Sequence, residues 1–364
     1  MTDNERFLLK LVRAGMGFPA KEVLPKITIQ MLENLYQLAS DQTVVGLAIE
    51  GLEKCDISSA KGSPILLEWI GMTTQTAARN ESQIKTVGDV YNLFAQELLP
   101  PVVMKGTVVA QEYPNPLSRI PGDIDLYFTP ESGKKAVALA KQKGLDVFEE
   151  SERDISFHYK DCLIEIHPYV AHQALQKKYA CDQRFQKWCE EELTNHYRTA
   201  TIGYNPTEIH VPSVMMTLVY GFYHLWIHFV RSGIGLRHLC DWVMCLHNYH
   251  GQYDEGELKK LLRDFGLFGP WEGFSGIAVD YLGLPSEEMP FYRKTNQAEK
   301  ILNLMFKEGN FGHKEESVVY SKNPVKWVFQ KVDYTLSRYW KVGRIFPKDV
   351  VNFLPSWKTL KKRQ

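Results

Sequence analysis

The sequence has few cysteines, and their spacing excludes the common zinc and disulfide patterns. Six cysteines are scattered over 364 residues without a CxxC pair, so neither a zinc ribbon nor a disulfide framework is expected, and the thiols suit a reducing cytosol. Long hydrophobic runs are also missing. The longest, residues 214–230, is interrupted by two histidines, falls short of a membrane-spanning helix, and predicts a buried core helix.

The chain also lacks internal repeats and low-complexity segments, and its first residues lack the apolar run of a signal peptide. Hydrophobic residues make up 44% of the sequence and charged residues 24%, which is the composition of a folded protein with two or three domains. These features predict a cytoplasmic protein.

The spacing of hydrophobic residues divides the chain into three predicted parts. Apolar residues recur every three or four positions in residues 1–98 and again in 206–364, which predicts an N-terminal helical region and a C-terminal helical domain. Residues 99–205 contain short β-branched segments and an amphipathic helix, typical of a small mixed sheet with flanking helices. The predicted fold class is α+β.

One predicted strand of the central part carries two carboxylates. In GDIDLYF, alternation places Asp123, Asp125 and Tyr127 on one face and the apolar residues on the other. Two like charges about 7 Å apart repel each other, and a divalent cation between them would relieve that cost in a cleft. Asp123 and Asp125 are therefore candidate metal ligands and catalytic residues.

A later predicted strand, CLIEIHPYV, supplies a third carboxylate, Glu165. Three acidic side chains on adjacent strands could hold two Mg²⁺ or Mn²⁺ ions about 3.5 to 4 Å apart, which would activate an attacking hydroxyl and stabilise charge on phosphorus. Asp161, in the adjacent turn, could substitute for Glu165. His167 shares the predicted acidic face and could contact a substrate phosphate, shuttle a proton or orient Glu165.

Upstream, the segment MKGT joins the end of a strand to the start of a helix. A glycine there lets the backbone approach a phosphate, and the N–H groups of a first helical turn attract anions. Lys105 and Arg119 could add positive charge, although Lys105 could also point to solvent and Arg119 could pair with a surface carboxylate. The segment predicts a nucleoside triphosphate site formed by Lys105, Gly106, Thr107 and Arg119.

With these motifs the sequence resembles the nucleotidyltransferase superfamily that includes DNA polymerase beta and the aminoglycoside nucleotidyltransferases. The strand followed by Gly-Thr, the later arginine, GDIDLYF and the IEIHPY strand carry the resemblance. More narrowly, they are similar to an uncharacterised bacterial nucleotidyltransferase-like group, and the segment from His224 to Trp242 is similar to the C-terminal part of that group.

The resemblance implies a polymerase-beta-like fold and a role for each matching position. Gly106 and Thr107 match the family's Gly-Ser that binds the triphosphate. Asp123 and Asp125 match its metal-binding pair, and Glu165 matches its third carboxylate, which is usually aspartate. Threonine replaces the usual serine, and sixteen positions separate Thr107 from Asp123, more than in compact members, so the intervening loop is expected to be specialised.

Two pairs in the C-terminal region are further candidates for substrate binding. His224 and His228 have the spacing of a metal pair on a helix, but no third ligand follows at the spacing of zinc proteases. They are expected in the core or at the acceptor site. Arg237 and Asp241 are also four positions apart, and could pair with each other or bind substrate.

The C-terminal segment is basic and aromatic. From Lys322 to the end it contains eleven lysines and arginines but two aspartates, with tryptophan and tyrosine interleaved. Such a segment could contact RNA or an anionic membrane surface, although a solvated helix face is the commoner arrangement.

The predicted activity is transfer of a nucleoside monophosphate from a nucleoside triphosphate such as ATP to an acceptor hydroxyl, with release of pyrophosphate. The acceptor could be a small molecule, sugar, peptide, protein or RNA. A non-catalytic nucleotide- or partner-binding module and an RNA-modifying nucleotidyltransferase are the alternatives. Removal of Asp125 is expected to abolish turnover and to leave the fold intact, because it relieves like-charge repulsion.

Overall fold

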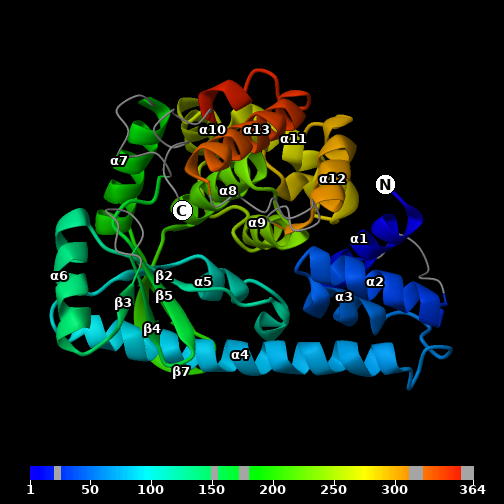
Figure 1. The fold of residues 1–364 in the computed structure, drawn as a ribbon, viewed down its shortest axis with the longest axis horizontal. Helices are drawn as coiled ribbons and strands as arrows, with labels where there is room; N and C mark the ends of the chain where they lie inside the picture. Colours follow the sequence, from blue (N-terminus) through cyan, green and yellow to red (C-terminus); the bar gives the residue numbers. More distant parts are fainter. Residues whose placement is uncertain (20–25, 149–154, 172–179, 311–322, 354–364) are drawn as a thin grey trace. The chain divides into compact units, whose positions relative to one another are not determined.

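The structure, a computed structural model, describes residues 1–19, 26–148, 155–171, 180–310 and 323–353. These residues form thirteen α-helices and one seven-stranded sheet, which confirms a mixed α+β protein (Figure 1). They divide into two compact units: unit 1 comprises Met1–Leu66, Phe222–His247 and Asp254–Gln364, and unit 2 comprises Leu67–Gly221 and Asn248–Tyr253. The three-part division along the sequence stays a prediction.

The sheet belongs to unit 2. Its strands are β1 (Val102–Met104), β2 (Ile124–Tyr127), β3 (Val147–Phe148), β4 (Ile155–Tyr159), β5 (Cys162–His167), β6 (Arg198–Ile202) and β7 (Asn205–Val211). Their order across the sheet is β3-β4-β5-β2-β1-β7-β6. β2 pairs in parallel with β5 and β1 in parallel with β7, whereas the other neighbours are antiparallel. β1, β2 and β5 lie in the strand before Gly106 and in the segments GDIDLYF and CLIEIHPYV, where the sequence predicts strands.

The hairpin of β6 and β7 was not predicted. Helical structure is expected from residue 206 onward, but Asn205–Val211 forms a strand that pairs with β1 through Val102 and His210. Only Ile209 and Val211 of this strand are fully buried hydrophobic residues, so its alternation is too short to be distinguished from the apolar helix that follows.

One face of the sheet packs on an apolar core. Ile124 and Leu126 of β2 and Ile164 and Ile166 of β5 belong to it, which confirms the predicted alternation of both strands. The long helix α4 (Pro64–Ala95) passes across the strands in the view of Figure 1. It adds to this core the side chains of Ile84, Val87, Val90, Tyr91 and Phe94.

Three shorter helices complete the part of unit 2 around the sheet: α5 (Gly106–Ala110), α6 (Pro130–Gln142) and α7 (Ala180–Asn195). α6 begins at Pro130, because the Thr129 hydroxyl accepts a hydrogen bond from the backbone N–H of Ser132 and so caps the helix. It ends before Gly144, which has a φ of 79°, a conformation that glycine adopts without steric cost.

Unit 1 is helical. It contains α1 (Asp3–Gly15), α2 (Ile29–Asp41), α3 (Val45–Leu52), α9 (Leu236–Asn248), α10 (Glu255–Asp264), α11 (Phe268–Gly276), α12 (Gln297–Glu308) and α13 (Pro324–Gly343). α8 (Val214–Arg231) begins in unit 2 and continues into unit 1. Short helical turns are η1 (Pro116–Ser118), η2 (Ile277–Tyr281), η3 (Ser286–Glu288) and η5 (Val350–Phe353). The first three helices and α8 occupy segments predicted as helical.

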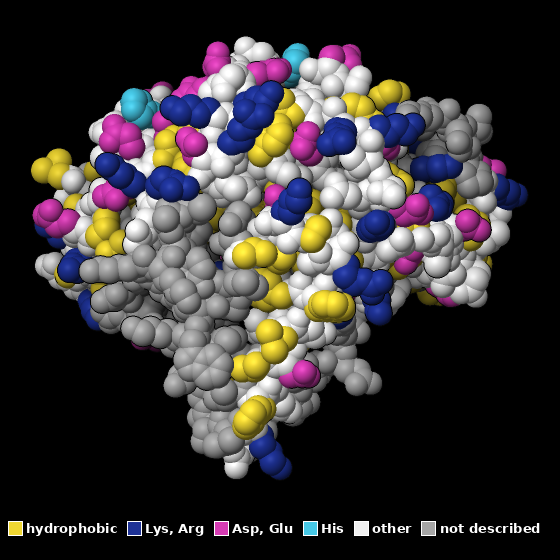
Figure 2. All heavy atoms as spheres, turned by 90° about the horizontal axis from the view of Figure 1, so that it is seen from above, with side chains coloured by type: hydrophobic (Ala, Val, Ile, Leu, Met, Phe, Trp, Pro, Cys, Tyr) yellow, Lys and Arg dark blue, Asp and Glu magenta, His cyan; other side chains and the backbone are white. Residues whose placement is uncertain are grey.

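In the part of the chain that the structure describes, no helix is both long and apolar enough to cross a membrane. Of the predicted basic tail, residues 354–364 lie outside the described ranges. α13 exposes Phe329, Leu336 and Trp340, each by more than 60%. On the face shown in Figure 2, basic side chains lie among acidic and hydrophobic ones. Contact of the tail with RNA or a membrane stays a prediction.

α1 and α3 approach each other at two glycines. A Cβ atom at Gly15 would lie 2.1 Å from the carbonyl oxygen of Leu47, and one at Gly51 would lie 2.1 Å from the carbonyl oxygen of Leu11. Both neighbours are backbone atoms, which cannot move aside as a flexible side chain can. α1 and α3 can therefore pack this closely only because both positions are glycine.

Replacement of Gly51 by alanine should lower the free energy of unfolding by about 1–3 kcal/mol, because the two helices must separate to admit the methyl group. Gly71 offers a matched control: it lies in the exposed face of α4 with nothing within 4 Å of an added Cβ. G71A should stabilise the protein by up to about 1 kcal/mol through helix propensity. Urea denaturation measures both, and a stabilising G51A would contradict the close approach.

Candidate active site

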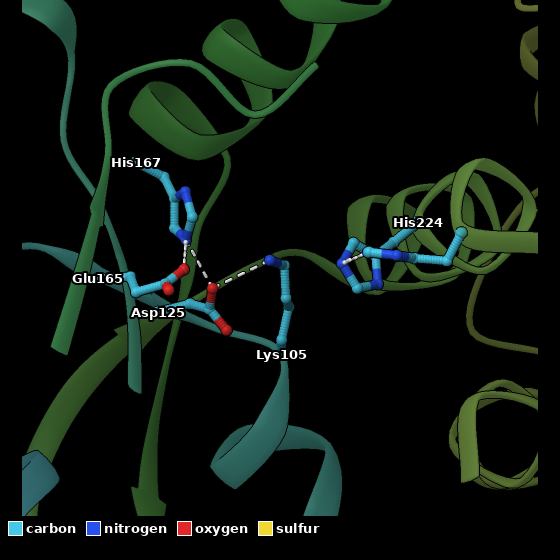
Figure 3. A network of polar contacts seen from close by, with 6 residues as sticks. Lys105, Asp125, Glu165, His167 and His224 are labelled. Atoms are coloured by element: carbon cyan, nitrogen blue, oxygen red, sulfur yellow. Dashed lines mark hydrogen bonds and ion pairs between the residues drawn. The ribbon is translucent and has the colours of Figure 1, made fainter. Parts of the chain in front are cut away.

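The pairing of two strands creates the candidate site. In the parallel register of β2 and β5, Asp125 lies opposite Glu165 and Tyr127 lies opposite His167. Since residues two apart share a face, Asp125, Glu165 and His167 project from the same side of the sheet, away from the apolar core. One ligand atom from each of these three residues lies within 4.8 Å of the other two (Figure 3).

Asp125 is the centre of this group. Its side chain is 3% exposed, and its Oδ1 atom lies 2.9 Å from the Lys105 Nζ and 2.6 Å from the His167 Nε2. The same His167 nitrogen is 3.3 Å from the Glu165 Oε2. Two nitrogen groups therefore contact one oxygen of a buried carboxylate (Figure 3). Of the roles predicted for His167, these contacts support orientation of Glu165.

These contacts shift the pKa values of Asp125, Glu165 and His167. Burial tends to raise the pKa of Asp125, but the Lys105 charge and the hydrogen bond with His167 outweigh burial and lower it to about 2. The hydrogen bond with His167 also lowers the pKa of Glu165. Burial and the Lys105 charge tend to lower the pKa of His167, yet its bonds with the two carboxylates raise it overall. Both carboxylates are therefore ionised at neutral pH.

Asp123 behaves differently. It precedes β2, and burial followed by the negative charges of Asp125 and Glu165 raises its pKa to about 6. It is coupled to the cluster by charge but is not one of the three residues whose ligand atoms group together. Removal of a carboxylate would therefore relieve repulsion at Asp123. The expectation that removal of Asp125 relieves repulsion is wrong, because Lys105 and His167 both contact its carboxylate and lower its pKa.

The residues predicted to bind the triphosphate meet at the end of β1. A Cβ atom at Gly106 would lie 3.4 Å from the Asp123 carbonyl oxygen and 3.9 Å from the Arg119 guanidinium. Thr107 is buried, and its hydroxyl is 3.3 Å from the Gln83 Oε1. The ammonium of Lys105 points at Asp125 and lies 5.6 Å from the centre of the Tyr220 ring, so the alternative in which it points to solvent is wrong.

Two amides of α4 hold the loop that carries Arg119, and the sequence analysis missed both. Asn80 donates hydrogen bonds of 2.8 and 2.7 Å to the carbonyl oxygens of Leu117 and Arg119, and Gln83 donates one of 2.6 Å to that of Gly122. Arg119 itself is 7% exposed, so it is not a surface residue. Two amide side chains three positions apart on the polar side of a predicted helix are the sequence feature that could have indicated these contacts.

Asp161 was the alternative to Glu165, and that alternative is wrong. Asp161 is exposed in the turn that precedes β5. Glu165 and not Asp161 faces Asp125 in the sheet and belongs to the ligand group.

The predicted substrate-binding residues of the C-terminal region lie on α8 and α9. The Nε2 atoms of His224 and His228 are 3.0 Å apart, so one ring donates a hydrogen bond to the other (Figure 3). Their ring centres lie 6.1 and 5.9 Å from that of His238 on α9, but among the described residues these histidines do not form a group of three ligands within 4.8 Å. Arg237 and Asp241 lie one turn apart on α9. Substrate binding by any of these residues stays a prediction.

The donor set at Asp125 fits a divalent cation. It offers two carboxylates and one imidazole within 4.8 Å of one another. Carboxylate oxygen suits Mg²⁺ and Mn²⁺, and an imidazole nitrogen is a donor that transition metals such as Mn²⁺ accept more readily than Mg²⁺ does.

A comparison with protein families identifies the family of the chain. The model of a family described as an uncharacterised nucleotidyltransferase matches residues 30–283, and the chain belongs to this family. The matched region contains the whole sheet and every residue of the candidate site. It confirms the resemblance to nucleotidyltransferases found in the sequence. Comparisons with curated proteins and with solved structures gave no match.

The two aspartates should have opposite effects on the stability of the metal-free protein. D125N leaves Lys105 and His167 without a buried counter-ion, and it should lose roughly 2–4 kcal/mol of unfolding free energy at pH 7. D123N should gain on the order of 1 kcal/mol, because it removes a carboxylate whose ionisation the fold opposes. Urea denaturation in the presence of EDTA measures both changes.

The gain in D123N should depend on pH. An unfolded aspartate has a pKa of about 3.9, and the pKa of Asp123 in the fold is about 6. The folded state therefore binds this proton more tightly, and its contribution to stability is lost as the pH rises from about 4 to 6. Asp125, with a lowered pKa, contributes stability above about pH 4 that is lost toward pH 2. An equal gain of D123N at pH 4 and pH 7 would refute this assignment.

Proposed function

We propose that this protein transfers a nucleoside monophosphate from a nucleoside triphosphate to an acceptor hydroxyl and releases pyrophosphate, on a polymerase-beta-like fold. The observation that carries the proposal is the register of β2 and β5, which places Asp125 beside Glu165 at a buried position. Membership in a nucleotidyltransferase family supports it.

Asp125 and Glu165, with Asp123 beside them, would hold Mg²⁺ or Mn²⁺, and His167 adds a fourth donor. When bound, the metal lowers the pKa of the attacking hydroxyl and stabilises negative charge on the phosphoryl group. The protein contributes the fixed position of these side chains on two paired strands, which need no rearrangement to face the same point.

Lys105, Gly106, Thr107 and Arg119 would bind the phosphates. The absence of a side chain at Gly106 leaves its backbone open between the Asp123 carbonyl and the Arg119 guanidinium. The Thr107 hydroxyl is engaged with Gln83, so its backbone N–H is the group left to donate. Arg119 supplies a charged fork held in place by the contacts of its loop to α4.

Glu165 would accept or relay the proton of the attacking hydroxyl. Its pKa is lowered by the hydrogen bond with His167, so it is ionised and able to accept at neutral pH. In the metal-free protein His167 holds this carboxylate in place, because its Nε2 atom lies 3.3 Å from the Glu165 Oε2.

D123N gives the sharpest test of this activity, because it is expected to keep the fold. Each of the four triphosphates, labelled at the α-phosphorus, is incubated with Mg²⁺ or Mn²⁺ and a cell lysate as the source of acceptors. The wild-type protein should transfer the label and release pyrophosphate. D123N should be slower by at least about a hundredfold, because part of the charge stabilisation of the transition state is lost.

D161N is the matched control, since Asp161 is an exposed aspartate at the start of the same strand region, and it should transfer label at the wild-type rate. Undiminished transfer by D123N would rule out the mechanism. Nucleotide binding without pyrophosphate release for any triphosphate would instead favour the non-catalytic binding module.

A further inference from the structure

Lys105 has an unusual backbone conformation for a residue with a side chain. It follows β1 directly and has a φ of 53° and a ψ of −139°, a combination that glycine adopts readily and that costs other residues about 1–3 kcal/mol. The register of β1 and β2 pairs Met104 with Asp125. The strained residue is therefore the one whose side chain can reach back to Asp125.

The Lys105 ammonium occupies the position of a cation in the acidic cluster. It lies 2.9 Å from the Asp125 Oδ1, which belongs to the carboxylate that is grouped with Glu165 and His167. At this distance the lysine forms an ion pair with a carboxylate whose side chain is 3% exposed, and so balances its charge.

We propose that Lys105 is the resident cation of this cluster, which leaves Asp125 when a divalent metal ion binds and is then available to the phosphates of a nucleotide. The inference rests on the proposed function, because it takes the same residues as the metal and nucleotide site. The new element is that Lys105 first occupies the metal position at Asp125 and then binds the nucleotide phosphates.

Such an exchange couples the two ligands. A metal ion that binds alone must displace the ammonium from Asp125, and this displacement weakens its affinity. A nucleotide that accepts the released ammonium recovers part of that cost. By linkage, each ligand then raises the affinity of the other by the same factor.

Binding of Mn²⁺, measured by electron paramagnetic resonance of the free ion, tests the exchange without any turnover. K105M should bind Mn²⁺ alone about tenfold more tightly than the wild type, because no tethered cation competes. Addition of the α,β-methylene analogue of ATP should raise the Mn²⁺ affinity of the wild type by a larger factor than that of K105M.

Two further variants separate the causes. K135M removes a lysine from an exposed ion pair with Glu131 on α6, and its Mn²⁺ affinity should equal that of the wild type. K105G removes the same charge as K105M and fits the positive φ without strain, so it should show the same tighter Mn²⁺ binding in a protein that folds even if K105M does not.

Acetylation of lysines, read by mass spectrometry, follows the ammonium directly. Lys105 should react slowly in the metal-free protein, because its amino group is paired with the buried Asp125 carboxylate, and faster once Mn²⁺ has displaced it. Lys135, with a side chain that is 61% exposed, serves as the reference in the same sample and should react equally in both states.

Equal Mn²⁺ affinity in the wild type, K105M and K105G, or a Lys105 that stays unreactive when Mn²⁺ is bound, would overturn the exchange and leave the proposed function intact. Failure of the wild type and both variants to bind Mn²⁺ would overturn the proposed metal dependence and the exchange together.

Discussion

Parallel pairing of two strands places a buried carboxylate beside a partly exposed one, and the rest of the site depends on this constraint. Because Asp125 and Glu165 lie opposite each other in β2 and β5, two like charges lie close together, and this is costly where one of the side chains is only 3% exposed. The metal-free protein meets this cost with two nitrogen groups, from Lys105 and His167. The sheet determines this arrangement, because β1 and β5 flank the strand of Asp125. His167 lies on β5, and Lys105 follows directly after β1.

The loop that carries Arg119 is held by neutral groups instead. Asn80 and Gln83 donate from α4 to backbone carbonyl oxygens, which fixes the loop and adds no charge to a region already dominated by charge. The same helix packs Phe94 and its neighbours on the apolar face of the sheet. α4 thus links the hydrophobic core of unit 2 to the position of the predicted phosphate-binding residues, so that the stability of one and the geometry of the other have a common support.

Local patterns predicted the parts of the site that lie within single strands. Alternation in GDIDLYF and CLIEIH placed Ile124 and Ile164 in the core and Glu165 on the acidic face, because side-chain direction in a strand is a local property. The residues that contact the carboxylates and hold the loop could not be predicted from alternation within one strand. The contact of Lys105 with Asp125 depends on strand order and on a positive φ, and the role of Gln83 depends on where a distant helix packs. The strand Asn205–Val211 was missed because only two of its residues are buried, too few to show a strand alternation before the apolar helix that follows.

That missed strand has a bearing on the strained lysine. β1 has three residues, and a strand so short at the edge of a sheet could bend to relieve an unfavourable φ at its end. β7 pairs with β1 on the side opposite β2, through Val102 and His210, so β1 is an interior strand that is held on both sides. The conformation of Lys105 then follows from the backbone around it, with Met104 fixed against Asp125. A hairpin that contributes no charged group to the site is in this way part of what keeps a cation on Asp125.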